Sequence, residues 1–185
     1  MRARLLAVPQ DAFALPGTIA DNLSPYAAPG TSTTTTASSA AAAEAALRRV
    51  GLWDAVCARG GLAAPFTDDL LSHGQRQLFA LARALLRAEG HGGGGVVLLD
   101  EATGSVDADT EARVREVLRE ALGAWTVVAV AHRLETIVDF DRVLVLEAGC
   151  VVEEGRPAEL LAGGGNGRFK ALWEASRGRE DGGGA

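Results

Sequence analysis

The sequence predicts an α/β protein that is organised around a parallel sheet. Residues 96–99 and 126–131 are continuous apolar runs without alternation, a pattern typical of strands that are buried on both faces of such a sheet. A polar stretch with helical character, about 108–122, lies between them. Strands that alternate with helices indicate parallel strands joined by right-handed crossovers, and in such sheets ligands bind beyond the carboxyl ends of the strands.

The composition favours one domain that is soluble or peripheral to a membrane. With 185 residues and 48% hydrophobic content, the chain can bury one sizeable core. Its 18 basic and 24 acidic residues give a net charge of −6, which argues against binding to nucleic acid or to an anionic membrane. Cys57 and Cys150 are far apart and have no metal-binding or redox spacing, which favours a reducing, cytosolic setting. No apolar run approaches the ~20 residues of a membrane helix.

The first predicted strand is the short apolar run 5–8, which ends at Pro9 and is followed by Gln10. Thr18 stands where it can cap a short helix that runs to Leu23. The polar side chain of Gln10 is therefore expected at the carboxyl end of a strand.

Two contrasting stretches follow this short helix. Residues 29–39 are rich in Thr, Ser and Ala, so we expect a low-complexity, mobile surface insert without chemistry. A helix is predicted from about 40 to 50, and Gly51 ends it. Residues 53–69 contain several glycines and a proline, and we expect them to be irregular.

The next helix begins with the stretch L-S-H-G-Q at residues 71–75 and runs to about Arg87. Ser72 and Gln75 have the spacing of a capping box, in which each side chain bonds to the backbone of the other residue. Gly74 is a poor helix former, so its place in the first turn suggests that something approaches the backbone there. A helix N-terminus with free N–H groups and a hydroxyl is suited to bind an anion, although an ordinary capped amphipathic helix explains the same residues.

The C-terminal part predicts a hairpin and two closing helices. A strand at 142–146 is expected to turn at residues 148–149 into 150–153, which would form a hairpin at the edge of the sheet. Helices at 157–161 and 168–175 and a frayed tail at 178–185 complete the chain.

Polar side chains follow three of the predicted strands at the point where each strand ends. Gln10 follows the first strand, Asp100 and Glu101 follow the run 96–99, and His132 follows the next run. Each of them alone has an ordinary structural explanation. Because the carboxyl ends of parallel strands meet at one edge of a sheet, their combination indicates a common site.

In this order and at these positions, the residues resemble the motifs of an ABC transporter nucleotide-binding domain, over nearly the whole chain. The matching stretches are 8–11 (Q-loop), 71–75 (signature), 96–101 (Walker B strand with its catalytic glutamate), 104–107 (D-loop) and His132 (switch histidine). The amino-acid sequence of residues 9–23, 76–86 and 100–107 is most similar to that of the second nucleotide-binding domain of subfamily C, the multidrug-resistance-associated transporters. The resemblance implies a P-loop NTPase-type parallel sheet with helices and a helical signature subdomain at about 40–90.

The resemblance also implies a role for each residue at the strand ends. Glu101 would polarise the hydrolytic water, and Asp100 would support Mg²⁺. His132 would contact the γ-phosphate of ATP. Gln10 would respond to Mg²⁺ and the water, and its loop would contact the transmembrane domain.

A second set of roles concerns a partner domain. Ser72, Gly74 and Gln75 would bind the γ-phosphate of ATP held by a second nucleotide-binding domain, and Asp107 would help to join the two sites. The resemblance thus implies a head-to-tail dimer with ATP and Mg²⁺ between its halves, attached to transmembrane domains at the cytosolic face of a membrane. It implies ATP hydrolysis coupled to the export of a solute.

The sequence departs from the family pattern at His73, in the Ser/Thr/Ala insert, which replaces a stretch that in relatives is more acidic and helical, and in the absence of a Walker A loop. His73 stands where the common signature has a glycine, so it would modulate the phosphate site. A Walker A loop requires Gly-Lys-Ser/Thr, and the only lysine of this chain is Lys170, between Phe169 and Ala171. Residues 1–177 therefore resemble the C-terminal part of a nucleotide-binding domain, an incomplete P-loop fold, and we expect the isolated chain not to hydrolyse ATP.

Two alternatives remain at this point. The chain can be a non-catalytic module that supplies its signature helix to the ATP site of a partner. It can also be part of the head of a chromosome-maintenance or DNA-repair ATPase, a class that shares these motifs. The acidic balance and the absence of a heptad-bearing segment argue against the second alternative.

Overall fold

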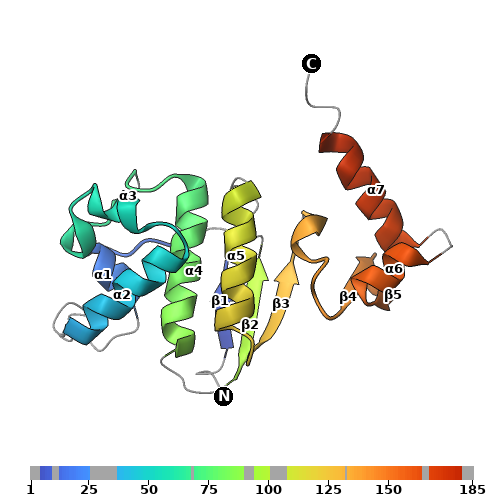
Figure 1. The fold of residues 1–185 in the computed structure, drawn as a ribbon, viewed down its shortest axis with the longest axis horizontal. Helices are drawn as coiled ribbons and strands as arrows, with labels where there is room; N and C mark the ends of the chain where they lie inside the picture. The colour runs from blue at the N-terminus through green and yellow to red at the C-terminus, as the bar shows by residue number, and fades with distance from the viewer. Residues whose placement is uncertain are drawn as a thin grey trace. The chain divides into compact units, whose positions relative to one another are not determined.

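The computed structural model describes residues 5–9, 13–25, 37–67, 69–89, 94–100, 108–131, 133–163 and 167–180. They form two compact units, Met1–Val130 and Ala131–Ala185. The first unit contains a parallel sheet and most of the helices, and the second contains a hairpin and two helices (Figure 1).

Three parallel strands form the sheet of the first unit: β1 (Leu5–Val8), β2 (Val96–Asp100) and β3 (Thr126–Val130), in the order β1-β2-β3. In the register of this sheet Val8 lies opposite Leu99, and Leu99 lies opposite Ala129. The carboxyl ends of all three strands therefore meet at the same edge. This confirms the α/β fold class with a parallel sheet.

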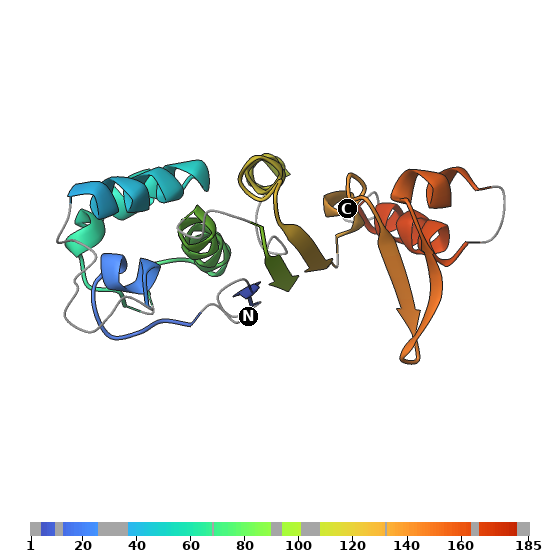
Figure 2. The ribbon, with the colours of Figure 1, turned by 90° about the horizontal axis from the view of Figure 1, so that it is seen from below.

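One face of the sheet is covered by helices, and in the described residues of the first unit the other face is bare. The helices α4 (His73–Glu89) and α5 (Ala108–Ala121) lie on one side of it (Figure 2). On that side Leu6, Val8, Val97 and Leu99 are buried.

On the opposite side the strands expose Leu5, Leu98, Val128 and Val130, with Val130 60% exposed. The prediction that the runs 96–99 and 126–131 are buried on both faces was therefore wrong for this structure. The strands have the composition of doubly covered strands, but no helix in the described residues of the first unit packs on their second face.

The helical region between β1 and α4 consists of α1 (Ile19–Leu23), α2 (Ala37–Arg49), α3 (Trp53–Cys57) and a 3₁₀ turn (Gly61–Ala63). Thr18 caps α1 as predicted, in a full capping box with Asp21. α2 begins earlier than expected, because Ala37–Ser39 of the low-complexity stretch are already helical. The stretch 53–69, expected to be irregular, contains α3 and the 3₁₀ turn. The remaining residues of the insert, up to Thr36, lie outside the described residues.

A single apolar core joins this helical region to the sheet. Its fully buried side chains include Leu47 of α2, Val56 of α3, and Phe79, Leu81 and Leu85 of α4. α4 is thus packed against the helical region and against β1 together (Figure 1). This central place fixes the position of its N-terminus.

The second unit is built on the hairpin of β4 (Val143–Glu147) and β5 (Cys150–Gly155). Ala148 and Gly149 in the turn both have positive φ, 49° and 81°, as a type I′ turn requires. The hairpin was predicted, but its place at the edge of the parallel sheet was not correct. β4 and β5 form a separate two-stranded sheet, and in the described residues no ladder connects them to β1–β3.

Two helices complete the second unit, α6 (Pro157–Ala162) and α7 (Arg168–Glu180). Pro157 occupies the first helical turn of α6, where its missing N–H is not needed. α7 runs five residues beyond the predicted end at Ala175. The first residues of the predicted tail, 178–180, are therefore helical, and 181–185 lie outside the described residues.

Candidate functional site

The N-terminus of α4 is closed by a reciprocal pair of hydrogen bonds. The backbone N–H of Ser72 donates to Oε1 of Gln75 at 3.0 Å, and the N–H of Gln75 donates to Oγ of Ser72 at 3.3 Å. This is the capping box expected from the sequence. Because Oγ of Ser72 acts here as an acceptor, its hydroxyl hydrogen is still able to donate to a ligand.

Two backbone donors of the first turn are open. The N–H of Arg76 bonds to the carbonyl of Ser72 at 2.8 Å, whereas among the described residues neither His73 nor Gly74 has an acceptor for its N–H. The N-terminal end of a helix carries partial positive charge. Two N–H groups and one hydroxyl at this end form a donor set that fits a phosphate oxygen.

The approach to these donors runs over Ser72 and His73, which are both exposed. Gly74 is buried among atoms of the chain itself. His73, the residue that departs from the family pattern, is one of the two exposed residues at this helix end.

The second part of the candidate site lies at the carboxyl edge of the parallel sheet. Asp100 is the last residue of β2, is exposed, and lies opposite Val130 at the end of β3. An exposed carboxylate at this edge is suited to support Mg²⁺ directly or through water.

Four of the predicted site residues, Gln10, Glu101, Asp107 and His132, lie outside the described residues. The strand ends that lead to three of them are described. Gln10 comes two residues after the end of β1, Glu101 directly after β2, and His132 two residues after β3. The ends of these strands share one edge of the sheet, as the argument from the sequence required.

The sequence analysis missed a buried polar cluster around Arg83 of α4 and Asn22 of α1, which are 8% and 0% exposed. The signal was present in the sequence, because Arg83 interrupts the apolar stripe of an amphipathic helix. A charge at such a position requires several hydrogen-bond partners.

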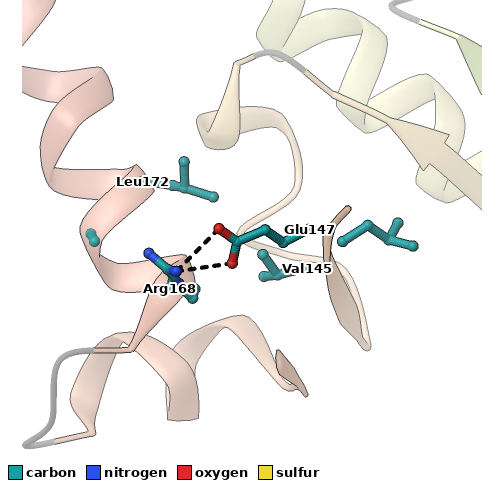
Figure 3. A pocket seen from close by; sticks show the side chains of 6 residues that line it. Val145, Glu147, Arg168 and Leu172 are labelled. Atoms are coloured by element: carbon teal, nitrogen blue, oxygen red, sulfur yellow. Dashed lines mark hydrogen bonds and ion pairs between the residues drawn. The ribbon is translucent and has the colours of Figure 1, made fainter. Parts of the chain in front are cut away.

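A hollow of about 290 Å³ lies in the second unit between the hairpin and α7 (Figure 3). Its lining is mostly aliphatic, with Val145 and Leu172 facing it, and Arg168 pairs with Glu147 across it at 2.9 Å. Both members of this ion pair are more than half exposed, so the pair adds little stability. Of the predicted site residues that the structure describes, none is among the residues that line this hollow.

The described part of the chain lacks two further features. No group of three or more His, Cys, Asp or Glu residues there could hold a metal ion. Among the helices of these residues, none has both the length and the apolar character that crossing a membrane requires.

The known proteins that this chain is similar to include several fungal ABC transporters. No family model matches the chain. The ABC-type transporter braE of Annulohypoxylon truncatum is 46% identical over 185 residues, which cover 94% of this chain and 12% of braE. The ABC transporter FUM19 of Gibberella moniliformis is 41% identical over 96% of this chain and 13% of its own length. ABC multidrug transporter B of Aspergillus fumigatus is 40% identical over 95% of this chain and 11% of its own length. The chain thus spans only about an eighth of the length of these relatives.

The fold has a counterpart among solved structures. A bacterial Atm1-family ABC exporter with ATP bound matches 94% of this chain with a TM-score of 0.76 and 30% sequence identity, and the match covers 28% of the exporter chain. The similarity of sequence and the similarity of fold therefore point to the same class of protein. The chain matches one region of ABC transporters, and its α/β fold is that of part of an ABC ATPase.

Proposed function

We propose that this chain is part of the ATP-binding and ATP-hydrolysing machinery of an ABC-type membrane transporter, in which hydrolysis drives the export of a solute. The observation that carries this proposal is the N-terminus of α4. There, among the described residues, the N–H groups of His73 and Gly74 have no acceptor, and the hydroxyl of Ser72 is still able to donate; Ser72 and His73 are exposed. An anion of the size of a phosphate group is the ligand that this arrangement fits.

In this proposal, Ser72 and the open N–H groups of α4 bind the γ-phosphate of ATP that is held by a second nucleotide-binding domain. The hydroxyl of Ser72 donates one hydrogen bond, and the N–H groups of His73 and Gly74 donate two more. Gln75 keeps Ser72 in the capping geometry through its bond to the backbone. The two domains would associate head to tail, with Asp107 at the junction between the sites.

The carboxyl edge of the sheet supplies the chemistry of hydrolysis. Asp100 would support Mg²⁺, which neutralises charge on the phosphates when it is bound. Glu101 would orient and polarise the attacking water, His132 would donate to the γ-phosphate, and Gln10 would bind near Mg²⁺ and the water. The exposed position of Asp100 at the end of β2 supports this assignment.

The lysine of the phosphate cradle would come from outside these residues. Lys170 is on α7, between Phe169 and Ala171, and has no Gly-Lys-Ser/Thr context. Because positioning and charge neutralisation account for most of phosphoryl-transfer catalysis, we expect negligible hydrolysis by the chain alone. Turnover by the isolated chain that Glu101→Gln abolishes would contradict this expectation.

Two finer assignments also belong to this proposal. The amino-acid sequence of residues 9–23 and 76–86 favours the second nucleotide-binding domain of subfamily C. Attachment to transmembrane domains would place the chain at the cytosolic face of a membrane. The combination of an intact signature helix with no Walker A lysine also favours a second candidate, a non-catalytic module that supplies Ser72 to the ATP site of a partner.

The test uses a chimera in which this chain replaces the matching region of braE, and ATP hydrolysis is measured in membrane vesicles. Ser72→Asp is the informative variant, because aspartate keeps the capping acceptor but has no hydroxyl and repels phosphate. We expect it to reduce turnover on the order of 100-fold, the effect of removing one donor from a phosphoryl or oxyanion site. Thr18→Ser, in the equivalent capping box of α1, is the control and should leave turnover unchanged.

Glu101→Gln separates the two candidate functions. Loss of turnover in both Ser72→Asp and Glu101→Gln supports the hydrolytic role, whereas loss in Ser72→Asp alone supports the non-catalytic module. A chimera that reaches the membrane and hydrolyses ATP equally well with Ser72→Asp would contradict both.

A further inference from the structure

Arg83 is a charged side chain in the interior of the first unit. It lies in the middle of α4 and is 8% exposed, and the neighbouring Leu81 and Ala82 are completely buried. Burial of a guanidinium group is unfavourable unless its N–H groups find good acceptors. The groups that accept from Arg83 therefore indicate its structural role.

Two of its acceptors come from a part of the chain that is distant in sequence. Nε of Arg83 donates to the backbone carbonyl of Asn22 at 2.7 Å, and Nη2 donates to the carbonyl of Phe13 at 3.3 Å. The guanidinium also lies over the ring of Phe13, with 4.2 Å between Cζ and the ring centroid, and over the ring of Phe79 at 5.6 Å. A planar cation over an aromatic face is attractive, and more so when it is removed from water.

Asn22 extends this cluster along the chain. Its side chain is completely buried. Its Oδ1 accepts from the N–H of Leu15 at 2.8 Å, and its Nδ2 donates to the carbonyls of Leu15 and Thr18 at 2.8 and 3.1 Å. Asn22 thus folds the segment 13–22 onto itself, and Arg83 fastens this segment to α4.

We propose that Arg83 is a positioning residue that makes the segment 13–22 and α4 move as one body. Ser72, at the phosphate end of α4, is about 16 Å from Arg83 along the helix, given a rise of 1.5 Å per residue. The segment begins shortly after β1, whose end belongs to the carboxyl edge of the sheet. We call the contacts of Arg83 with Phe13 and Asn22 the clamp. It links the segment that follows β1 to the helix that carries Ser72. Any effect of the clamp on ATP binding rests on the function proposed above.

The chemistry of the clamp is specific to arginine. Lysine would keep the charge, but it has no planar fork to reach two carbonyls and to stack on a ring at the same time. Phe13 is 43% exposed, so its ring can be changed without opening the core. Substitutions of Phe13 therefore test the clamp with little risk to folding.

The test is amide hydrogen exchange of the whole chain, followed by NMR at the N–H of Leu15. We expect Phe13→Leu and Arg83→Lys to accelerate exchange at Leu15 roughly tenfold or more, while the central amides of α4 keep their protection. Phe13→Tyr restores the aromatic face and should restore protection, which a purely hydrophobic role of residue 13 would not require. Arg59→Met is the matched control, because it removes an exposed arginine that donates to the carbonyl of the nearby Ala55.

The proposal is overturned if Phe13→Leu and Arg83→Lys leave exchange at Leu15 unchanged, or if Phe13→Leu behaves like Phe13→Tyr. A parallel titration with inorganic tripolyphosphate, observed at the amides of His73 and Gly74, tests the phosphate site separately. If the clamp exists but tripolyphosphate shifts neither amide, the proposed function fails and the clamp stands. If the clamp also couples the segment 13–22 to the start of α4, binding of tripolyphosphate will change the rate of amide exchange at Leu15 in the parent chain and not in Phe13→Leu.

Discussion

The carboxylate of Glu153 accepts a hydrogen bond of 2.6 Å from the backbone N–H of Phe169, in the first turn of α7. A carboxylate from β5 thus satisfies one of the open donors at the start of a helix, and its charge complements the helix dipole. Gly167 leaves room for this contact, because a Cβ at that position would be 2.8 Å from Oε1 of Glu153. The interaction fastens α7 to the hairpin.

We expect Glu153→Gln to reduce the free energy of unfolding of the second unit by about 1 kcal/mol, since it keeps an acceptor but removes the charge. Gly167→Ala should destabilise α7 as well, because its methyl group displaces the carboxylate. Urea unfolding followed at the indole N–H resonance of Trp173 measures both effects.

The neighbouring Glu154 provides the control for this prediction. Its carboxylate pairs with Arg142 at 2.7 Å, but both side chains are at least half exposed. Glu154→Gln should therefore change the free energy of unfolding by less than about 0.5 kcal/mol. Equal effects of the two substitutions would contradict the capping role of Glu153.

The pKa of Asp21 is held below its usual value by hydrogen bonds from the backbone N–H of Thr18 and then from its hydroxyl. Because the folded pKa is depressed, this contribution to stability is fully present above the unfolded pKa of about 3.9 and is lost as the pH falls through the folded pKa. We expect Thr18→Ala to raise the pKa of Asp21 in an NMR titration. Thr18→Ala keeps the backbone N–H bond and removes only the hydroxyl bond, so a titration curve of Asp21 that does not respond to this substitution would exclude the hydroxyl of Thr18 as a cause.

The bare face of the parallel sheet predicts a difference between two isosteric substitutions. Val128→Thr, at a position 49% exposed, should lower dye binding to apolar surface and light scattering, with little change in the free energy of unfolding. Val97→Thr, at a completely buried position on the adjacent strand, should cost about 1–3 kcal/mol, because its hydroxyl loses its hydrogen bonds to water. Similar costs for the two variants in urea unfolding would show that both faces of the sheet are covered in solution.

This bare face also marks what the sequence can and cannot predict. The apolar runs correctly predict β2 and β3 and their parallel pairing, because this pattern is a local property of each strand. Which face is covered depends on what packs there, and the composition of Leu98 and Val128 is that of covered residues. For the same reason, the local turn signal at Ala148 and Gly149 predicts the hairpin, but not the sheet to which it belongs.

In the candidate site, too, the sequence predicts the local contacts and not the long-range ones. The spacing of Ser72 and Gln75 predicts the hydrogen bonds that the structure contains, since a capping box is formed within four residues. The cluster of Arg83 with Asn22 and Phe13 joins residues more than 60 positions apart. The interrupted apolar stripe of α4 marks Arg83 as unusual, but no local pattern identifies its distant partners. The assignments of Gln10, Glu101, Asp107 and His132 remain predictions from the motif and from the strand ends that precede them.

The cap at α4 allows its structural role and its ligand role to be separated in the chain itself. Ser72→Ala removes the acceptor for the N–H of Gln75 and should cost about 0.5–2 kcal/mol in urea unfolding. Ser72→Asp keeps an acceptor and adds a negative charge at the positive end of the helix, so stability should be retained or raised. If the open donors of α4 bind phosphate oxygens, Ser72→Asp should nevertheless abolish the shifts that tripolyphosphate causes at the amides of His73 and Gly74, because the added carboxylate repels the anion. An unchanged response in Ser72→Asp would place the binding of tripolyphosphate away from the start of α4.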